Sequence, residues 1–317
     1  MMDWSDRHCR YFFRQLSPHA IVYTEMVTTG ALLHGDVPRH LDFDAAEHPI
    51  ALQLGGSEAH DLSHCARLGE QWGYDEINLN CGCPSERVQR GAFGACLMAE
   101  PELVADCVKA MQDAVSIPVT VKHRLGIDSI EDFDFVSRFV ETLARAGCTG
   151  FMVHARNAVL KGLSPKDNRE VPPLKYPYVY RLKQEFPALE IVINGGLNDV
   201  AGISEQLRHV DGVMLGRVAY HDAYILANLE AALFSGGTAL SRREIVGAMQ
   251  AYADDQIAKG TPLRSIARHM LGLFHGRPRA RLWRQMLSDP AELARNDPAL
   301  FGEALRAVET EAVAIAA

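Results

Sequence analysis

The sequence predicts a (β/α)8 TIM barrel followed by a C-terminal helical domain. Short apolar runs alternate with helix-like stretches through most of the chain, and no strand pattern follows residue 235 or so. In addition, polar and Gly-rich segments come directly after the apolar runs, where barrels carry their functional loops. We therefore divide the 317 residues into a barrel, 1–235, and a helical domain, 236–317.

Seven runs are short and apolar, as expected for parallel strands buried on both faces: residues 21–24, 50–54, 76–79, 119–122, 150–153, 191–194 and 212–215. Helices are predicted between them at 59–72, 101–115, 130–146, 177–185 and 200–209. Pro101 suits a first helical turn and Gly147 a helix stop. Seven strands are one short of a full barrel, and the opening Met1-Met2-Asp3-Trp4 is typical of a loop that follows a strand. We therefore expect the first strand to be missing and the start to be truncated or mis-assigned.

The last part of the chain has helical signals and a cluster of basic residues. Gly236-Gly237 is typical of a linker, and Ser241 with Glu244 has the spacing of a capping box, from which three or four helices are expected. The net charge of −8 weighs weakly against a nucleic-acid partner, yet residues 256–288 contain no Asp or Glu and six Arg: Arg264, Arg268, Arg277, Arg279, Arg281 and Arg284. Charge alone leaves open whether this patch binds a polyanion or pairs with acidic neighbours.

Composition narrows the class of protein. The chain is 48% hydrophobic and 23% charged, which is ordinary for a globular protein. With no bilayer-length apolar run and no secretory signal, we expect a cytoplasmic protein without a membrane partner. Seven cysteines, an odd number, are expected to be reduced, and their spacing predicts no metal site.

Cys83 is the candidate catalytic residue. It lies in Asn80-Cys81-Gly82-Cys83-Pro84-Ser85, directly after a predicted strand, where Gly and Pro would hold it at the strand end. An ordinary thiol, with a pKa of about 8.5, is mostly protonated at neutral pH and can donate a proton. The alternative is a buried, inert cysteine.

Other strand ends indicate a polar pocket. Gln53, Lys122 and His154 each end a predicted strand. Alone, each could be a solvated loop residue, but a Lys at a buried strand end is costly unless it meets an anion. The last two strands are followed by Asn194-Gly195-Gly196 and Gly216-Arg217, where barrels bind phosphate through backbone N–H groups. These loops predict a phosphorylated cofactor such as FMN.

The motifs together resemble those of tRNA-dihydrouridine synthases. The resemblance rests on seven stretches in order: MMDWSDR (1–7), LQLGG (52–56), NLNCGCPS (78–85), VKHR (121–124), VHAR (153–156), INGG (193–196) and LGR (215–217). Two further stretches, GLSPKDNR (162–169) and RARLWR (279–284), resemble the A-type subfamily, which acts on D-loop uridines 20 and 20a. The resemblance extends from Met1 to about Leu287.

The resemblance implies a chemistry and a set of residues. FMN would be the cofactor, NADPH (or NADH) the reductant and tRNA the partner, with hydride passing from flavin N5 to uracil C6 and a proton from Cys83 to C5. It implies cofactor contacts from Met1, Met2, Gln53, Lys122, His154, Asn194, Gly195, Gly196, Gly216 and Arg217. It implies tRNA contacts from Asn80, Lys166, Arg169, Arg281 and Arg284. We expect a monomer.

Two departures from the family pattern keep two alternatives open. The family has a strand and Ala-Pro before the Met-Met-Asp-Trp segment, and a small aliphatic residue where Cys81 stands here. Another FMN barrel acting on a free pyrimidine would share the phosphate loops, although it leaves the C-terminal Arg cluster unexplained. A tRNA-binding protein that has lost catalysis is supported only by the missing strand.

Overall fold

A parallel sheet with helices outside it forms the first part of the protein. The computed structural model describes residues 1–234 and 239–309. Its seven strands follow one another across the sheet in chain order, and β2 to β7 pair in parallel. They are β1 (Val22–Thr28), β2 (Ile50–Gly55), β3 (Glu76–Cys81), β4 (Val119–His123), β5 (Gly150–His154), β6 (Glu190–Asn194) and β7 (Gly212–Met214). All seven predicted strands are confirmed, in a TIM-barrel-like arrangement.

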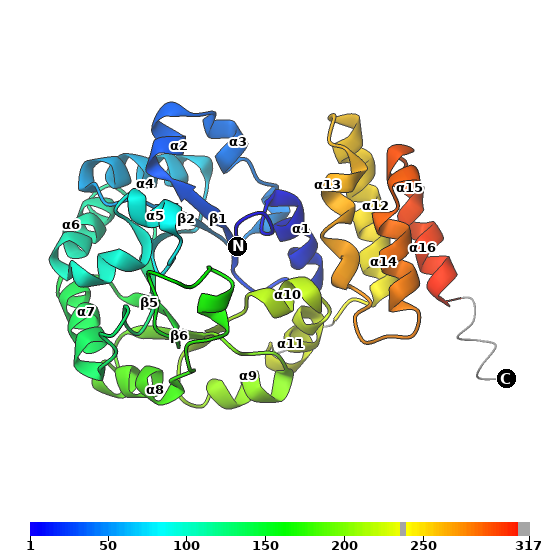
Figure 1. Ribbon diagram of the computed structural model, residues 1–317. Helices are drawn as coiled ribbons and strands as arrows, with labels where there is room; N and C mark the ends of the chain where they lie inside the picture. The colour runs from blue at the N-terminus through cyan, green and yellow to red at the C-terminus, as the bar shows by residue number, and fades with distance from the viewer. Residues whose placement is uncertain (235–238, 310–317) are drawn as a thin grey trace. The chain divides into compact units, whose positions relative to one another are not determined.

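The helices that follow these strands lie on the outside of the sheet (Figure 1). They are α2 (Thr29–His34), α3 (Val37–Leu41), α4 (Ala59–Trp72), α5 (Glu86–Arg90), α6 (Pro101–Gln112), α7 (Phe133–Arg145), α8 (Tyr176–Glu185) and α9 (Val200–Gln206), with 3-10 turns η2 (Gly94–Ala99) and η3 (Asp167–Arg169). The predicted helix start and helix stop are both confirmed. Pro101 is the first residue of α6, and α7 ends just before Gly147, whose φ of +100° is left-handed.

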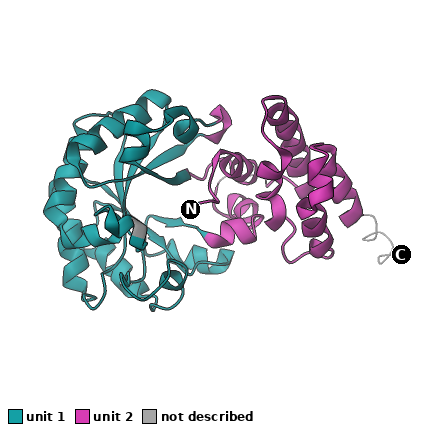
Figure 2. Ribbon diagram, turned by 45° about the horizontal axis from the view of Figure 1, so that its top comes forward, with its two compact units in different colours: residues 1–2, 23–43, 48–216 teal, residues 3–22, 44–47, 217–317 magenta. Residues whose placement is uncertain are grey.

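The chain forms two compact units, each built from several segments. Unit 1 comprises Met1–Met2, Tyr23–Phe43 and His48–Gly216, and unit 2 comprises Asp3–Val22, Asp44–Glu47 and Arg217–Ala317 (Figure 2). The predicted boundary at 235 and 236, with its Gly236-Gly237 linker, lies outside the described residues. Unit 2 therefore takes in an N-terminal segment that the sequence assigned to the barrel.

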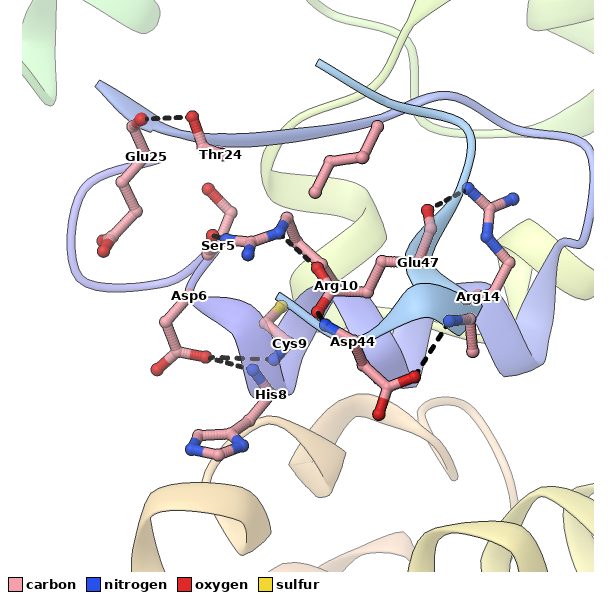
Figure 3. A network of polar contacts seen from close by, with 12 residues as sticks. Ser5, Asp6, His8, Cys9, Arg10, Arg14, Thr24, Glu25, Asp44 and Glu47 are labelled. Carbon is pink, nitrogen blue, oxygen red and sulfur yellow. Dashed lines mark hydrogen bonds and ion pairs between the residues drawn. The ribbon is translucent and has the colours of Figure 1, made fainter. Parts of the chain in front are cut away.

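The N-terminal helix α1 (Arg7–Leu16) explains why that segment groups with unit 2. Asp6 caps it by accepting from the N–H groups of His8 and Cys9. Phe12 and Leu16 are buried in the hydrophobic core of unit 2. On another side of α1, Arg10 donates to Glu47 at 2.6 Å in a buried ion pair (Figure 3). Apolar packing and this ion pair together hold residues 3–22 and 44–47 in unit 2.

The remaining elements of unit 2 are helical. They are η1 (Ala45–Glu47), α10 (Arg217–His221), α11 (Ile225–Leu233), α12 (Arg242–Ala258), α13 (Leu263–Ala267), η4 (Met270–Gly272), α14 (Ala280–Ser288), α15 (Pro290–Ala294) and α16 (Ala299–Glu309). The predicted capping box of Ser241 and Glu244 is confirmed at the start of α12. Residues 239–309 contain five α-helices where three or four were expected, because α13 and α15 are only about one turn long. No helix among residues 1–234 and 239–309 is long and apolar enough to cross a membrane.

Candidate active site

Polar side chains from five neighbouring strands of unit 1 come together at the carboxyl ends of the sheet. Strand register places Asn80 of β3 opposite Lys122 of β4, and His154 of β5 opposite Asn194 of β6. Gln53 of β2 reaches the same layer, because its side-chain oxygen accepts from Asn80 Nδ2 at 2.8 Å. The sheet thus gathers side chains that are far apart in the sequence.

Cys83 lies on the loop between β3 and α5, and its side chain is half-buried. Asn80 Oδ1 accepts from the backbone N–H of Gly82 at 3.1 Å and from that of Cys83 at 3.0 Å. On the other side, the carbonyl of Cys83 accepts from the N–H of Ala95 at 2.9 Å. The backbone of the predicted catalytic cysteine is therefore held from both directions while its thiol remains accessible.

Cys81 differs from Cys83 in its burial. Its side chain is fully buried, and burial raises its pKa well above the usual thiol value. Side chains alternate along a strand, so Cys81 faces away from the side shared by Asn78 and Asn80. This position favours Cys83 over Cys81 as the reactive thiol.

Lys122 brings a cation to the strand-end layer. Its Nζ donates to Asn194 Oδ1 at 3.2 Å, and Asn194 Nδ2 donates in turn to the carbonyl of Met214 at 2.7 Å. Burial lowers the pKa of Lys122 to about 7, and the nearby Arg124 guanidinium contributes to this lowering. Lys122 would regain its full charge next to a bound anion.

His154 is a neutral, buried donor or acceptor beside two glycines. Burial, followed by the charges of Arg124 and Lys122, holds its pKa well below the usual range. Its Nδ1 is buried and has no hydrogen-bond partner among the described residues. A Cβ added to Gly195 would lie 3.0 Å from His154 Nε2, and one at Gly196 would lie 2.5 Å from Leu174; both glycines have positive φ. The loop therefore needs glycine at both positions.

The remaining cofactor candidates lie at the chain start and after β7. A Cβ built on Gly216 would lie 3.6 Å from Met1 Sδ, so these two residues are neighbours in unit 1. Met2 is largely exposed. Arg217 begins α10 and belongs to unit 2, so the pair Gly216-Arg217 spans the division between the units.

Arg124 organises the site, and its neighbour His123 does not belong to it. Arg124 is buried and donates to the carbonyls of Gly82 at 3.2 Å, Asn157 at 3.1 Å and Asn168 at 2.8 Å. It thereby joins the Cys83 loop to the loop after β5. The ring of His123 contacts Phe139 and Phe151 in the apolar layer. Side chains alternate along a strand, so Lys122 and His123 point to opposite faces of the sheet.

Gln89 of α5 joins the same two loops through one amide group. Its Nε2 donates to the carbonyls of Pro84 and Leu160, both at 2.8 Å. We expect Gln89→Met, which keeps the length but removes both donors, to weaken this link by about 1–3 kcal/mol. Amide hydrogen exchange in segments 82–90 and 155–175 should then be faster than in the parent protein.

The matched control for that prediction is Gln112→Met. Gln112 also donates one side-chain hydrogen bond to a carbonyl, that of Gly147, at 2.8 Å. It lies at the end of α6, so its replacement should leave exchange in 82–90 and 155–175 unchanged. Equal exchange in the parent and in Gln89→Met would mean that Gln89 does not hold the two loops together.

The predicted RNA-contacting residues fall into three settings. Asn80 is buried and holds the Cys83 loop, which leaves one Nδ2 hydrogen for a substrate. Lys166 is exposed and Arg169 half-buried, on the loop after β5 in unit 1. Arg281 and Arg284 are exposed on α14 in unit 2, three residues apart and hence on one face.

No group of three or more His, Cys, Asp or Glu side chains within 1–234 and 239–309 is placed to hold a metal ion. All seven cysteines are free thiols in the structure.

Comparison with known proteins identifies the family. The family model described as dihydrouridine synthase (Dus) matches residues 1–311. The tRNA-dihydrouridine(20/20a) synthases of Xanthomonas campestris pv. campestris and Synechocystis sp. are 54% and 53% identical over the whole chain and are covered over 94% and 95% of their own length. That of Pseudomonas syringae pv. tomato is 56% identical over 98% of this chain and 92% of its own.

A solved structure supports the fold. A 2-naphthoyl-CoA reductase complex superimposes with a TM-score of 0.55 at 11% identity, over 71% of this chain and 47% of the other. The family model and the three relatives confirm the family expected from the motifs, and the relatives' names agree with the expected subfamily. The protein belongs to the dihydrouridine synthase family, oxidoreductases that reduce uridine to dihydrouridine.

Proposed function

We propose that this protein reduces uridine to 5,6-dihydrouridine at D-loop positions 20 and 20a of tRNA, with FMN as cofactor and NADPH, or NADH, as reductant. Family membership implies a flavin and a nicotinamide in general; the choice of FMN and NADPH is the finer proposal. The observation that carries it is the placement of Cys83. Its thiol is accessible on a loop that Asn80 fixes, and Asn80 lies opposite Lys122 in the sheet.

The residues present fit a flavin. His154 offers a buried Nδ1 without a partner among the described residues, and Lys122 offers a cation whose pKa burial has lowered. Gly195 and Gly196 have positive φ and no room for side chains, as in loops whose backbone closely approaches a ligand. We assign cofactor contacts to these residues together with Met1, Met2, Gln53, Asn194, Gly216 and Arg217.

The bound cofactor supplies the hydride that becomes bonded to C6 of the uracil ring. Cys83 supplies the proton: its S–H bond breaks, a C–H bond forms at C5, and the thiolate left behind regains a proton from solvent. Lys122 and Arg124 give the pocket a positive charge that favours the electron density building up on the C4 carbonyl. Asn80 keeps the Cys83 backbone in place during this transfer.

The target uridine is part of a folded RNA, so it must be turned out of its stack to reach Cys83. We assign phosphate and sugar contacts to Lys166, Arg169, Arg281 and Arg284, with Asn80 at the base. The proposed partner is tRNA, and we propose that the protein acts as a monomer in the cytoplasm, where tRNA is modified.

An anaerobic flavin titration tests the proposal. The purified protein should show flavin absorption that NADPH bleaches and that tRNA lacking dihydrouridine restores. Restoration by free uridine or uracil and not by tRNA would instead support an enzyme acting on free pyrimidines. A protein that binds tRNA but never reoxidises with it would support the binding-protein alternative. Full-length similarity to tRNA-modifying relatives, helical unit included, favours the tRNA enzyme.

Arg281 and Arg284 provide a separate test of the RNA surface. Neither forms an ion pair with another described residue, so both are available for phosphates. Changing both to Ala should weaken tRNA binding and reduce the slope of log affinity against log salt by about 1 for each phosphate that is no longer neutralised. Filter binding at several salt concentrations measures this slope.

The control for the salt experiment is Arg295→Ala. Arg295 is also an exposed cation of unit 2, but it already pairs with Glu292 at 2.6 Å and Glu303 at 3.3 Å. Its removal should leave the salt slope unchanged. An unchanged slope in the double variant would place the phosphate-binding surface elsewhere.

A further inference from the structure

A chain of hydrogen bonds runs along the sheet of unit 1 from the buried Glu76 to the Cys83 loop. Thr120 Oγ1 donates to Glu76 Oε1, and Asn78 Nδ2 donates to Thr120 Oγ1 at 2.8 Å. Gln53 Nε2 donates to Asn78 Oδ1 at 2.9 Å, and Asn80 Nδ2 donates to Gln53 Oε1 at 2.8 Å. Asn80 Oδ1 then accepts from the N–H groups of Gly82 and Cys83.

The strand geometry explains why these groups meet. Residues 76, 78 and 80 of β3 alternate with apolar neighbours, so they share one face of the sheet. Register places Asn78 between Gln53 of β2 and Thr120 of β4. At about 3.3 Å per residue, the path from Glu76 to Asn80 covers about 13 Å, the length of the buried strand.

In every hydrogen bond of this path the donor lies on the Cys83 side of its acceptor, and Glu76, which accepts at the other end, fixes that direction. An ionised carboxylate only accepts, and a neutral carboxyl group still accepts at the oxygen that carries no proton; Glu76 Oε1 accepts from both Thr120 and Tyr23. Thr120 has one hydrogen, which it gives to Glu76, so its lone pairs must accept from Asn78. Asn78 thereby turns its oxygen toward Gln53, and Gln53 turns its oxygen toward Asn80.

The far end of the chain is the oxygen that holds Cys83. A reversed Asn80 amide would present N–H groups to the N–H groups of Gly82 and Cys83, and neither hydrogen bond to the loop could form. The direction is reinforced at Asn78, whose second Nδ2 hydrogen faces the sulfur of Met152 at 3.5 Å, a weak acceptor. The three amides are buried, Asn78 completely, and this burial limits competition from water.

We propose that Glu76, Thr120 and Asn78 are positioning residues that act through Gln53 and Asn80 to hold the Cys83 loop in its proton-donating arrangement. The inference rests on the proposed function for its catalytic meaning, since it assigns a purpose to Cys83. The hydrogen-bonded path itself stands on the structure. None of the three positioning residues touches the reacting atoms.

One consequence concerns Gln53. Its amide already accepts from Asn80 and donates to Asn78, so one Nε2 hydrogen and one Oε1 lone pair remain for the cofactor. Gln53 thus joins the proposed cofactor contacts to the Cys83 loop.

Thr120→Val tests the chain, because valine has nearly the same shape and no hydroxyl. Tyr23→Phe is the matched control: it also removes a hydroxyl that donates to Glu76 Oε1, but Tyr23 lies off the path to Cys83. Thr120→Ser keeps the hydroxyl and should rescue. If Thr120→Val does not fold, Thr120→Ala removes the same hydroxyl group and leaves a smaller side chain.

Two readouts apply, and the first needs no turnover. Hydrogen exchange of the Gly82 and Cys83 amides should be at least tenfold faster in Thr120→Val than in the parent, and within twofold of it in Tyr23→Phe and Thr120→Ser. With the flavin reduced beforehand, single-turnover formation of dihydrouridine should also slow at least tenfold in Thr120→Val, with a larger solvent deuterium isotope effect, while reduction by NADPH is unchanged.

The outcomes separate the inference from the proposed function. Unchanged exchange at Gly82 and Cys83 in Thr120→Val, or equal acceleration in Tyr23→Phe, would overturn the inference. Faster exchange with an unchanged single-turnover rate and isotope effect would also overturn it, because the loop would not then need positioning. A parent protein that makes no dihydrouridine in tRNA would refute the proposed function. The exchange experiment would still test whether the hydrogen bonds from Glu76 hold the Cys83 loop.

Discussion

Replacing Cys83 by alanine should lower the rate of dihydrouridine formation by about 10²–10⁴-fold, the usual contribution of a general acid. Removing a half-buried thiol leaves the backbone bonds of residue 83 to Asn80 and Ala95 in place. The flavin content and the affinity for tRNA should therefore stay close to those of the parent. Single-turnover measurements with pre-reduced enzyme isolate the step that Cys83 serves.

Cys81→Ala is the control, because it removes a second thiol two residues away. Cys81 is fully buried on the other side of the strand, so this change should cost stability and leave the single-turnover rate nearly unchanged. Parent-like turnover in Cys83→Ala would assign the proton to another donor. A loss of turnover in Cys81→Ala alone would make Cys81 that donor.

Replacing Lys122 by methionine should have the second largest effect. A cation hydrogen-bonded to a charged group contributes about 1.5–3 kcal/mol, and removing such a cation from the reduced flavin would lower its two-electron midpoint potential by about 30–60 mV. Turnover should fall about tenfold to a hundredfold as a result. Redox titrations of the parent, Lys122→Met and Lys122→Arg, which keeps the charge, measure the shift in midpoint potential. Equal potentials in all three proteins would show that Lys122 does not contact the cofactor.

The same variant should lose a pH dependence of stability. In the ligand-free folded protein the pKa of Lys122 is lowered to about 7, whereas the unfolded chain has the ordinary value of about 10.4. Between these values the unfolded state binds more protons, so the contribution of Lys122 to the free energy of unfolding rises with pH over this window. The change in the free energy of unfolding from pH 7 to pH 10, measured by denaturant melts of the flavin-free protein, should therefore be less positive in Lys122→Met than in the parent.

The sheet could be predicted because its signal is local. A strand covered on both faces must be short and apolar, and runs such as 50–54 and 150–153 meet this condition by themselves. The ends of those runs also located Lys122, His154 and Asn194, because parallel strands expose their carboxyl ends at one edge. Most of the predicted pocket follows from these two facts.

What the sequence did not predict depends on distant partners. The helix Arg7–Leu16 was not predicted, because the core that buries Phe12 and Leu16 comes from residues more than 200 positions later. The roles of Arg124 and Gln89 are set by carbonyls in loops that no local pattern places beside them. The hydrogen-bonded path from Glu76 could not be predicted for another reason. Alternating polar residues in an apolar strand are also typical of a strand that faces solvent. Only the strand register shows that the polar residues of β2, β3 and β4 lie next to one another.

The discontinuous make-up of unit 2 has a consequence for synthesis on the ribosome. α1 is made well before α12, α14 and α16, which complete its core. At a translation rate of about 5–20 residues per second, on the order of 10–60 s pass between the synthesis of Phe12 and Leu16 and that of the helices that bury them. During that interval the apolar face of α1 is exposed and favours aggregation, so we expect the yield of folded protein to depend on translation speed.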